Sequence, residues 1–339
     1  MALLVTGAAG FIGSNFVRML IDRGYENVVA IDSLTYAGNL ENIADLIDAK
    51  KITFEKADIV DSDAMAAIWK KHNVTRVAHF AAESHVDRSI LGSGPFVMSN
   101  VVGTQVLLDL AKQNEVERFV QVSTDEVYGT LPEDKPEVKF TEETPLQPNS
   151  PYSASKAAAD CFVRSYFETF GMPLMTTRCS NNYGPYQFPE KLIPLFVTNL
   201  MQGEQVPLYG DGMNIRDWLH VSDHCDAVLT VLEKGKPGEV YNVGGNNEQT
   251  NRAITEKLIA LCDRKWDEAV KYVKDRLGHD RRYAIDASKI KRELGWEPKR
   301  RWDEAIAETV QWYRDNKEWW QRIKSGAYRD YYDTQYANR

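Results

Sequence analysis

The sequence has few cysteines and no long apolar run. The four cysteines among 339 residues are spaced too widely for a metal-binding pair, so we expect reduced thiols that pack inside a cytoplasmic protein. No apolar run reaches the length of a membrane span, and no basic and apolar leader opens the sequence. These absences predict a protein without a membrane partner.

An excess of positive charge is also lacking. Forty-one basic against 49 acidic residues give a formal net charge of −8, which is unsuited to nucleic acid or an anionic membrane but leaves room for a local basic pocket. An apolar fraction of 43%, with 12 Phe, 8 Trp and 16 Tyr, excludes a mainly disordered chain. The length suits one large domain or two ordinary ones.

Short apolar runs alternate with helical patterns in the first half of the chain. The helical patterns cover residues 15–23 and 101–113. The runs show no polar alternation, as expected of parallel strands buried on both faces, and they are residues 3–6, 28–31, 52–54, 77–80 and 119–122. Repeated β-α-β units predict an α/β fold with a Rossmann-type doubly wound parallel sheet.

The second half has a different texture. Turn-rich residues 181–189 and a loop at 203–217 precede a helix at 223–233 and a strand at 240–243, which we expect to return to the first sheet. A long helix at 303–324 follows a charged, helical region. We therefore expect a smaller, partly interleaved C-terminal substrate domain, with residues 1–180 plus 218–245 in the nucleotide domain and 181–217 plus 246–339 in the substrate domain.

A glycine motif links the first strand to the first helix. Gly7 allows a tight turn, Gly10 lets the backbone approach a pyrophosphate, and Gly13 permits close helix packing. Asp32 closes the second strand, where a carboxylate accepts a ribose 2′-hydroxyl and repels a 2′-phosphate, so the motif predicts NAD rather than NADP. Asp58 and Ile59 could contact the adenine, and a simple turn explains them equally well.

A second motif begins a later helix. Ser150 is a good N-cap, Pro151 suits the first helical position, and Tyr152 and Lys156 stand one turn apart on the same face. A nearby ammonium and a nicotinamide cation would lower the pKa of Tyr152, so that its hydroxyl could act as a base.

With these two motifs, the chain resembles the extended short-chain dehydrogenase/reductase family from Gly7 to residue 280. The resemblance implies that Tyr152 takes a proton from a sugar hydroxyl while NAD takes the hydride from the same carbon. It also implies that Lys156 holds the nicotinamide ribose and that Thr124 assists Tyr152.

Two adjacent carboxylates, Asp125 and Glu126, follow the fifth strand at the edge where α/β proteins bind ligands. The pair could simply start a helix. An enzyme that eliminates water, however, needs a base to take a proton and an acid to protonate the leaving hydroxide.

Together with residues 81–89 and 180–185, this pair resembles the dTDP-glucose 4,6-dehydratases of the same family. The resemblance implies Asp125 as the acid toward the C6 hydroxyl and Glu126 as the base at C5, in deoxysugar biosynthesis such as that of rhamnose. It places further residues at the NAD site, namely Phe11, Ile12, Ser33, Leu34, Thr35, Phe80, Ala81, Ala82, Glu83, Ser84, Ser99 and Asn182. It places others at the nucleotide sugar, namely Ser84, Thr124, Asn181, Lys191, Leu192, Pro207, Tyr209, Arg216, Asn251, Arg276 and His279.

Several alternatives remain. Another nucleotide-sugar dehydratase and a 4-epimerase share much of the pattern, and a non-catalytic NAD-binding regulator would keep only the glycines. His79, His220 and His224 have no carboxylate or cysteine partners at metal-ligand spacing, and no metal is expected. Residues 101–113 and 152–170 resemble the helices that form a dimer interface in this family, which implies a homodimer.

Overall fold

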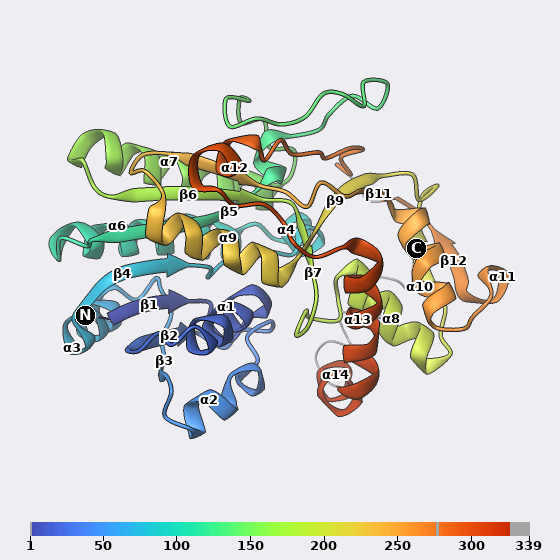
Figure 1. Ribbon diagram of the computed structural model, residues 1–339, viewed down its shortest axis with the longest axis horizontal. Helices are drawn as coiled ribbons and strands as arrows, with labels where there is room; N and C mark the ends of the chain where they lie inside the picture. The colour runs from blue at the N-terminus through green and yellow to red at the C-terminus, as the bar shows by residue number, and fades with distance from the viewer. Residues whose placement is uncertain (1, 276–277, 326–339) are drawn as a thin grey trace.

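A seven-stranded parallel sheet forms the larger lobe of the protein in this computed structural model, which describes residues 2–275 and 278–325 (Figure 1). Its strand order is β10-β6-β5-β4-β1-β2-β3, and the chain reverses its direction of winding between β1 and β4. The strands are β1 (Ala2–Thr6), β2 (Val28–Asp32), β3 (Thr53–Lys56), β4 (Val74–His79), β5 (Arg118–Thr124), β6 (Leu174–Cys179) and β10 (Val240–Val243). The predicted doubly wound parallel sheet is confirmed.

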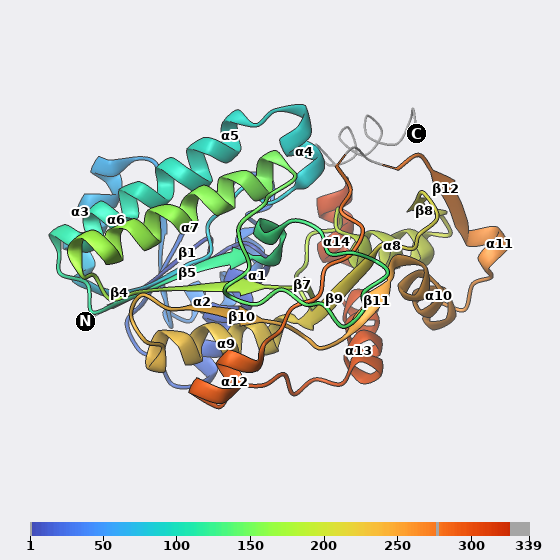
Figure 2. The same cartoon turned by 90° about the horizontal axis from the view of Figure 1, so that it is seen from above.

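Helices cover both faces of this sheet, as Figures 1 and 2 show. One face carries α1 (Phe11–Asp22), α9 (Val221–Lys234) and α12 (Ser288–Leu294). The other carries α3 (Ser62–His72), α6 (Gly103–Gln113) and α7 (Pro151–Phe170). Short elements fill the connections, namely η1 (Leu40–Asn42), α2 (Ala44–Asp48), α4 (Val86–Leu91), α5 (Gly94–Phe96), η2 (Val97–Val102) and η3 (Asp125–Tyr128).

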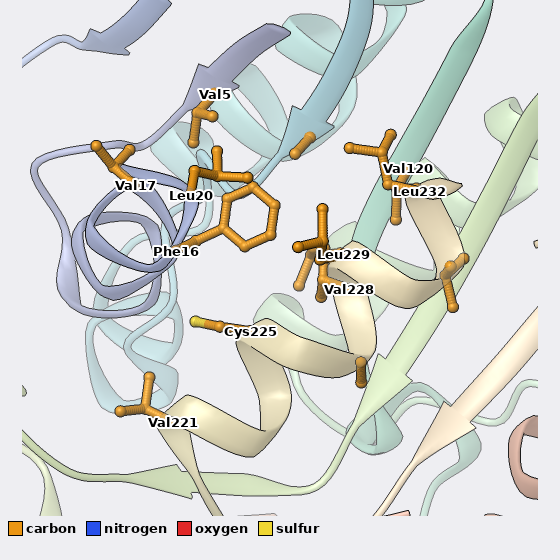
Figure 3. Packing of buried hydrophobic residues seen from close by; sticks show 14 of the residues in the cluster. Val5, Phe16, Val17, Leu20, Val120, Val221, Cys225, Val228, Leu229 and Leu232 are labelled. Atoms are coloured by element: carbon orange, nitrogen blue, oxygen red, sulfur yellow. The ribbon is translucent and has the colours of Figure 1, made fainter. Parts of the chain in front are cut away.

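The core between α1, α9 and the sheet is assembled from distant parts of the sequence. Phe16 and Leu20 of α1 point toward Cys225 and Leu229 of α9, above Val120 of β5 (Figure 3). All five side chains are at most 1% exposed. The helix and strand expected to return to the first sheet therefore do so, because α9 presents an apolar face to α1 and β10 pairs in parallel with β6.

The smaller lobe contains two short sheets and a helical layer. Strand β9 (Ile215–His220) pairs with β7 (Asn181–Tyr183) and β11 (Glu248–Thr250), while β8 (Val206–Tyr209) pairs with β12 (Val270–Val273). The core of this lobe is rich in aromatic side chains, including Trp218 and Trp320. The helices are α8 (Leu192–Gln202), α10 (Asn251–Leu261), α11 (Trp266–Ala269), α13 (Trp302–Asp315) and α14 (Lys317–Lys324).

The structure corrects three expectations from the sequence. Residues 203–217 are not all loop, because they contain β8 and the start of β9, whose partners β12 and β11 lie far away in sequence. The single helix expected at 303–324 is interrupted at Asn316, between α13 and α14. Cys161 is exposed on α7 rather than packed, although all four cysteines are free thiols. No helix in the described ranges is long and apolar enough to cross a membrane.

Candidate active site

The main cavity opens at the carboxyl ends of the large sheet and extends to the smaller lobe, with a volume of about 340 Å³. Such a crevice, where the strand order reverses, is the usual ligand site of an open α/β sheet. The cavity brings together all five residues expected to be catalytic. It is also lined by expected binding residues, namely Gly7, Gly10, Phe11, Ile12, Gly13, Asp32, Ser33, Thr35, Asp58, Ile59, Phe80, Ala81, Ala82, Glu83, Ser84, Ser99, Asn181, Asn182, Lys191 and Leu192.

The glycine turn between β1 and α1 leaves no room for side chains. Gly7 has φ +66°, and a Cβ there would lie 2.7 Å from the backbone nitrogen of Ala81. A Cβ on Gly13 would lie 2.1 Å from the carbonyl oxygen of Gly7. Bare backbone and the first turn of α1 therefore face the cavity together, which is the arrangement that accepts a pyrophosphate.

Asp32 is the last residue of β2, where it contacts the glycine turn and lines the cavity. Its carboxylate accepts hydrogen bonds from the backbone nitrogens of Ala9 (2.9 Å) and Leu34 (2.8 Å). Burial raises the pKa of Asp32, and these two hydrogen bonds oppose the rise. Leu34 itself does not line the cavity, so its role is to orient Asp32. The glycine turn and Asp32 together fit a dinucleotide with a free ribose hydroxyl.

Helix α7 presents Tyr152 and Lys156 to the cavity. Ser150 caps the helix by accepting a hydrogen bond from the Ser153 nitrogen (3.1 Å), and Pro151 occupies the first turn, as expected. Lys156 is 4% exposed, and its ammonium donates to the carbonyl oxygen of Val122 in β5 (2.7 Å). This contact holds the helix against the strand that leads to Asp125.

The predicted lowering of the Tyr152 pKa depends on two positive charges, the ammonium of Lys156 and the nicotinamide cation, whereas the other groups around Tyr152 act mainly in the opposite direction. Burial and the negative charge of Glu126 raise this pKa well above its usual value, while a hydrogen bond with Thr124 opposes the rise. The ammonium of Lys156 instead contacts a backbone carbonyl. Sequence spacing revealed Lys156 as a neighbour, but Glu126 reaches Tyr152 only through the tertiary fold.

Asp125 and Glu126 open η3 directly after β5. Thr124 caps this short turn by accepting a hydrogen bond from the Glu126 nitrogen (3.2 Å). Asp125 is 1% exposed, and burial together with the charges of Glu126 and Asp217 raises its pKa well above the usual value. Burial thus favours the protonated form of Asp125, and the half-buried Glu126 lies next to it in sequence, an arrangement that suits the acid and base of an elimination.

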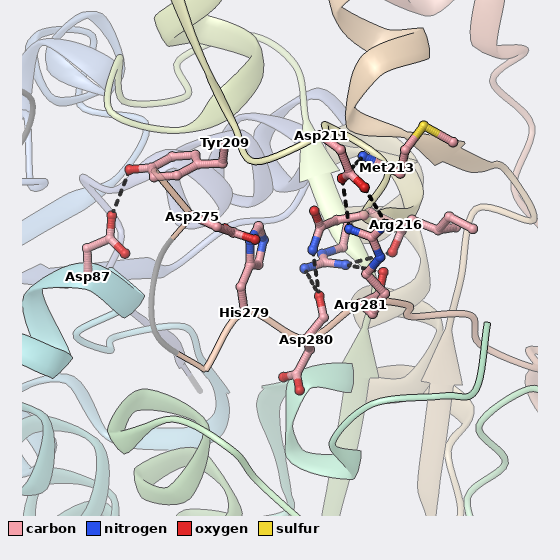
Figure 4. A network of polar contacts seen from close by, with 11 residues as sticks. Asp87, Tyr209, Asp211, Met213, Arg216, Asp275, His279, Asp280 and Arg281 are labelled. Atoms are coloured by element: carbon pink, nitrogen blue, oxygen red, sulfur yellow. Dashed lines mark hydrogen bonds and ion pairs between the residues drawn. The ribbon is translucent and has the colours of Figure 1, made fainter. Parts of the chain in front are cut away.

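Part of the expected nucleotide-sugar pocket lies in the smaller lobe, outside the cavity lining. Tyr209 donates to Asp87 (3.3 Å), and His279 pairs with Asp275 (2.5 Å), as Figure 4 shows. Arg216 is 5% exposed and donates to the Asp280 carbonyl oxygen (2.7 Å). Pro207 lies in β8, and Asn251 begins α10. Arg276 and the neighbouring Leu277 lie outside the described residues.

Glu190 is a cavity residue that sequence reasoning missed. Its carboxylate accepts a hydrogen bond from the Tyr36 hydroxyl (3.1 Å), and burial raises its pKa to about 7. Its position directly before Lys191, an expected ligand-binding residue, is the feature of the sequence that could have indicated Glu190. Among the described residues, no group of three or more His, Cys, Asp or Glu side chains could hold a metal ion. Other missed lining residues are Ile31, Ala37, Gly38, Ala57, Val122, Ser123, Cys179, Ser180, Gln187, Phe188 and Trp218.

Known proteins resemble the chain over nearly its whole length. The dTDP-glucose 4,6-dehydratase of Xanthomonas campestris pv. campestris is 52% identical, covering 96% of this chain and 97% of that protein. The dTDP-glucose 4,6-dehydratase 1 of Escherichia coli is 49% identical over the full length of both.

Solved structures agree with these relatives. The dTDP-glucose 4,6-dehydratase of Streptomyces venezuelae, crystallised with NAD and TYD bound, has a TM-score of 0.92 at 50% identity, covering 96% of this chain and 100% of that chain. The UDP-glucose 4-epimerase of Thermus thermophilus, in complex with NAD, has a TM-score of 0.86 at 30% identity, covering 93% and 100%. The family model described as GDP-mannose 4,6 dehydratase matches residues 4–309, and the chain belongs to that family of nucleotide-sugar 4,6-dehydratases.

Proposed function

We propose that this enzyme converts dTDP-glucose to dTDP-4-keto-6-deoxyglucose with the help of NAD. The observation that carries the proposal is the meeting of two pairs of groups in one cavity, Tyr152 with Lys156 and Asp125 with Glu126. The first pair suits oxidation at a sugar carbon, and the second suits the loss of water. Two dTDP-glucose 4,6-dehydratases that are 52% and 49% identical to this chain in sequence support the same substrate.

Tyr152 is the proposed base toward the C4 hydroxyl. NAD, when bound, supplies a hydride acceptor whose oxidised ring carries a positive charge. A positive charge in the cavity favours tyrosinate and so counteracts the effect of Glu126 on the Tyr152 pKa. Lys156 stays in place through its contact with Val122, and Thr124 hydrogen-bonds the Tyr152 hydroxyl.

Elimination follows because a C4 ketone acidifies the neighbouring C5 proton. In the proposed step, the Glu126 carboxylate takes that proton, and Asp125 gives its proton to the C6 hydroxyl, which leaves as water. The raised pKa of Asp125 favours the protonated carboxyl group, which is the form that can donate. Glu126, now protonated, can return a proton to C5 when the hydride returns to C6.

The chain's own residues divide the binding work between the lobes. We propose that the glycine turn holds the pyrophosphate of NAD and that Asp32 accepts a ribose hydroxyl, with Asn182 at the cofactor and Asn181 at the sugar. Tyr209, Arg216, Asn251 and His279 of the smaller lobe are proposed to contact the nucleotide of the substrate. The division into residues 1–180 plus 218–245 and 181–217 plus 246–339 stays a prediction.

One experiment tests both the reaction and the nucleotide. The purified protein is incubated with dTDP-, UDP- and GDP-hexoses without added NAD, and products are identified by mass and by NMR. We expect a 4-keto-6-deoxy product from dTDP-glucose, lighter than the substrate by one water. Activity on a UDP- or GDP-sugar alone would contradict the dTDP assignment. A product of unchanged mass with inverted C4 would indicate a 4-epimerase instead.

We also propose that the enzyme is a cytoplasmic homodimer in deoxysugar biosynthesis, such as that of rhamnose. Four apolar side chains in the two short helices before α6 are exposed, namely Ile90 (40%) and Leu91 (73%) of α4 and Val97 (48%) and Met98 (49%) of η2. Phe162 of α7 is 37% exposed. Free thiols suit a reducing compartment. Sedimentation of the wild type and of Leu91→Lys tests the interface, and a monomeric wild type at micromolar concentration would contradict it.

A further inference from the structure

Four buried polar side chains form a chain of hydrogen bonds outside the cavity lining. Arg178 of β6 donates through Nε to Asp160 of α7 (2.8 Å) and through Nη1 to the hydroxyl of Tyr128 (3.0 Å). Tyr128 in turn donates to Oδ1 of Asn242 in β10 (2.7 Å). The four side chains are at most 6% exposed. The proposed chemistry uses none of them directly.

This chain of hydrogen bonds connects the two groups of proposed catalytic residues. Asp160 follows Lys156 by one turn of α7, and Tyr128 ends η3, two residues after Glu126. Asn242 fixes the far end, because its Nδ2 donates to the Phe140 carbonyl oxygen (3.1 Å). The position of η3 relative to α7 therefore depends on the Tyr128 hydroxyl, which accepts one hydrogen bond and donates another.

The two connected elements differ in their other anchors. Helix α7 is also held by the contact of Lys156 with Val122 and by the hydrogen bond from Asn100 to Ser155 (2.8 Å). The four-residue turn η3 has its Thr124 cap, the hydroxyl of Tyr128, and a backbone hydrogen bond from the Gln147 nitrogen to the Val127 carbonyl oxygen (2.9 Å). The side chain of Val127 is buried in the same cluster as Ala157 of α7, so the hydroxyl of Tyr128 is one of several anchors. Short 3₁₀ turns have poorer hydrogen-bond geometry than α-helices. Loss of the Tyr128 hydroxyl should therefore displace η3 more than α7.

We propose that Tyr128 is a positioning residue for water elimination. Its hydroxyl holds η3 against the Asp160–Arg178 pair, and so places the carboxyl groups of Asp125 and Glu126 relative to the sugar held by Tyr152. The inference rests on the proposed dehydratase function. Tyr128 acts through the two carboxyl groups and does not itself line the cavity.

The substitution Tyr128→Phe tests this role. It keeps the ring, which stacks on Phe140 with centroids 5.0 Å apart, and removes only the hydroxyl. In single-turnover mixing with dTDP-glucose, we expect reduced nicotinamide to appear within about threefold of the wild-type rate. Its decay should slow by about tenfold to a hundredfold, because displacements of about 1 Å cost rates of that order. Reduced nicotinamide and 4-ketoglucose should accumulate, and solvent deuterium should enter C5 more slowly.

The matched control is Tyr241→Phe. Tyr241 is fully buried, lies next to Asn242 in β10, and accepts a hydrogen bond from the Lys236 nitrogen (3.2 Å). We expect this variant to keep the wild-type ratio of the two rates. If Tyr128→Phe slows both phases equally, or behaves as Tyr241→Phe does, the positioning role is wrong.

A second variant tests the same role in case Tyr128→Phe folds poorly. Arg178→Lys can keep the ion pair with Asp160 but has no fork to reach Tyr128 as well, so it should show the same shift toward slow decay, and an unchanged ratio of rates would overturn the inference. Glu126→Gln separates the two hypotheses. If Glu126→Gln stalls elimination while Tyr128→Phe does not, only the inference about Tyr128 fails. If Glu126→Gln eliminates water normally, the proposed function fails.

Discussion

Helix α7 and turn η3 face the same cavity but are built in different ways. Helix α7 runs for 20 residues from a Ser150 cap, so local hydrogen bonds place Tyr152 and Lys156 on one face. Turn η3 has four residues, and its position depends on the Thr124 cap, on the contacts of Val127 with distant parts of the chain, and on the hydroxyl of Tyr128. The proposed oxidation groups are therefore placed mainly by secondary structure, whereas the proposed elimination groups are placed by tertiary contacts.

Electrostatics couples the two elements. The charge of Glu126 raises the pKa of Asp125 in its own turn and that of Tyr152 across the cavity, in both cases after burial as the larger cause. Burial and the charge of Glu126 thus both favour the protonated forms of Asp125 and Tyr152. One residue of η3 therefore affects both its partner acid and the base in α7, and variants of each element should separate these effects.

The largest effect is expected from α7. Tyr152→Phe removes the proposed base at C4 and keeps the ring, which lies edge-on to Phe96 at 6.3 Å. Hydride transfer should fall on the order of a hundredfold or more, since general-base catalysis contributes about that much. The measurement is the rate at which reduced nicotinamide appears after mixing with dTDP-glucose.

Tyr166→Phe is the control within the same helix. Its hydroxyl donates to Asp109 (2.6 Å), outside the cavity. This variant should oxidise substrate as the wild type does. Near-normal hydride transfer by Tyr152→Phe would remove Tyr152 from the chemistry.

The second-largest effect on the reaction is expected from a substitution in η3. Glu126→Gln cannot take the C5 proton, so oxidation should proceed while the loss of water slows on the order of a hundredfold. Because the negative charge of Glu126 raises the pKa of Tyr152, its removal should also shift the pH profile of oxidation toward lower pH. Absorbance of reduced nicotinamide and deuterium entry at C5 report the two steps.

Glu168→Gln changes an exposed carboxylate of α7 in the same way and should leave both steps unchanged. Formation of the 4-keto-6-deoxy sugar by Glu126→Gln at the wild-type rate would show that Glu126 is not the base. A single-carbon reaction like that of an epimerase would then explain the site better.

The sequence predicts features that neighbouring residues determine, and it does not predict features that depend on contacts between distant residues. The cap at Ser150 and the pair Tyr152 and Lys156 are local patterns, and the structure places them as expected. The strands β8 and β9 are not local, because their partners lie far along the chain, and the sequence suggested a loop there. The effect of Glu126 on the pKa of Tyr152 could not be predicted for the same reason, since Glu126 is a neighbour of Tyr152 only after folding.

Arg216 shows the same limit in the proposed substrate pocket. The family resemblance places Arg216 at the nucleotide sugar, and in the structure its guanidinium donates to the carbonyl oxygens of Ile215 and Asp280 and lies over the ring of Tyr283. A sequence identifies the charge but not the backbone carbonyls that surround it. The glycine turn was easier to predict, because its geometry depends on consecutive residues.

A smaller effect is expected from the two capping residues. Ser150→Ala removes the cap of α7 and should destabilise the protein by about 1 kcal/mol, with turnover changed less than about twofold because the remaining helix holds Tyr152 in place. Thr124→Val removes the cap of η3 and a hydrogen bond to Tyr152, and should lower turnover by about tenfold or more. Urea unfolding and turnover are measured on the same preparations. Equal losses of turnover in the two variants would contradict the difference between helix and turn.

The smallest effect concerns stability and pH at Asp125. The folded pKa of this group is raised above its unfolded value, mainly by burial, so folding is favoured while the carboxyl group is neutral in both states. As the pH rises from the ordinary aspartate pKa through the raised value, the unfolded chain ionises first and the wild type loses stability. Asp125→Asn keeps the shape and cannot ionise, so its melting temperature should exceed that of the wild type by an amount that grows with pH. Each kcal/mol corresponds to roughly 2–4 °C in domains of about 150–250 residues, and the shift should be smaller in this longer chain of 339 residues. Thermal unfolding of both proteins between about pH 5 and pH 8 measures the gap. Asp217, whose pKa is also raised, is present in both proteins, so its contribution is shared.

Parallel melting curves would mean that Asp125 is ionised in the folded protein, and the proton for the leaving hydroxide would then need another source. A widening gap together with slower elimination would show that this buried acid is kept for chemistry at the expense of stability.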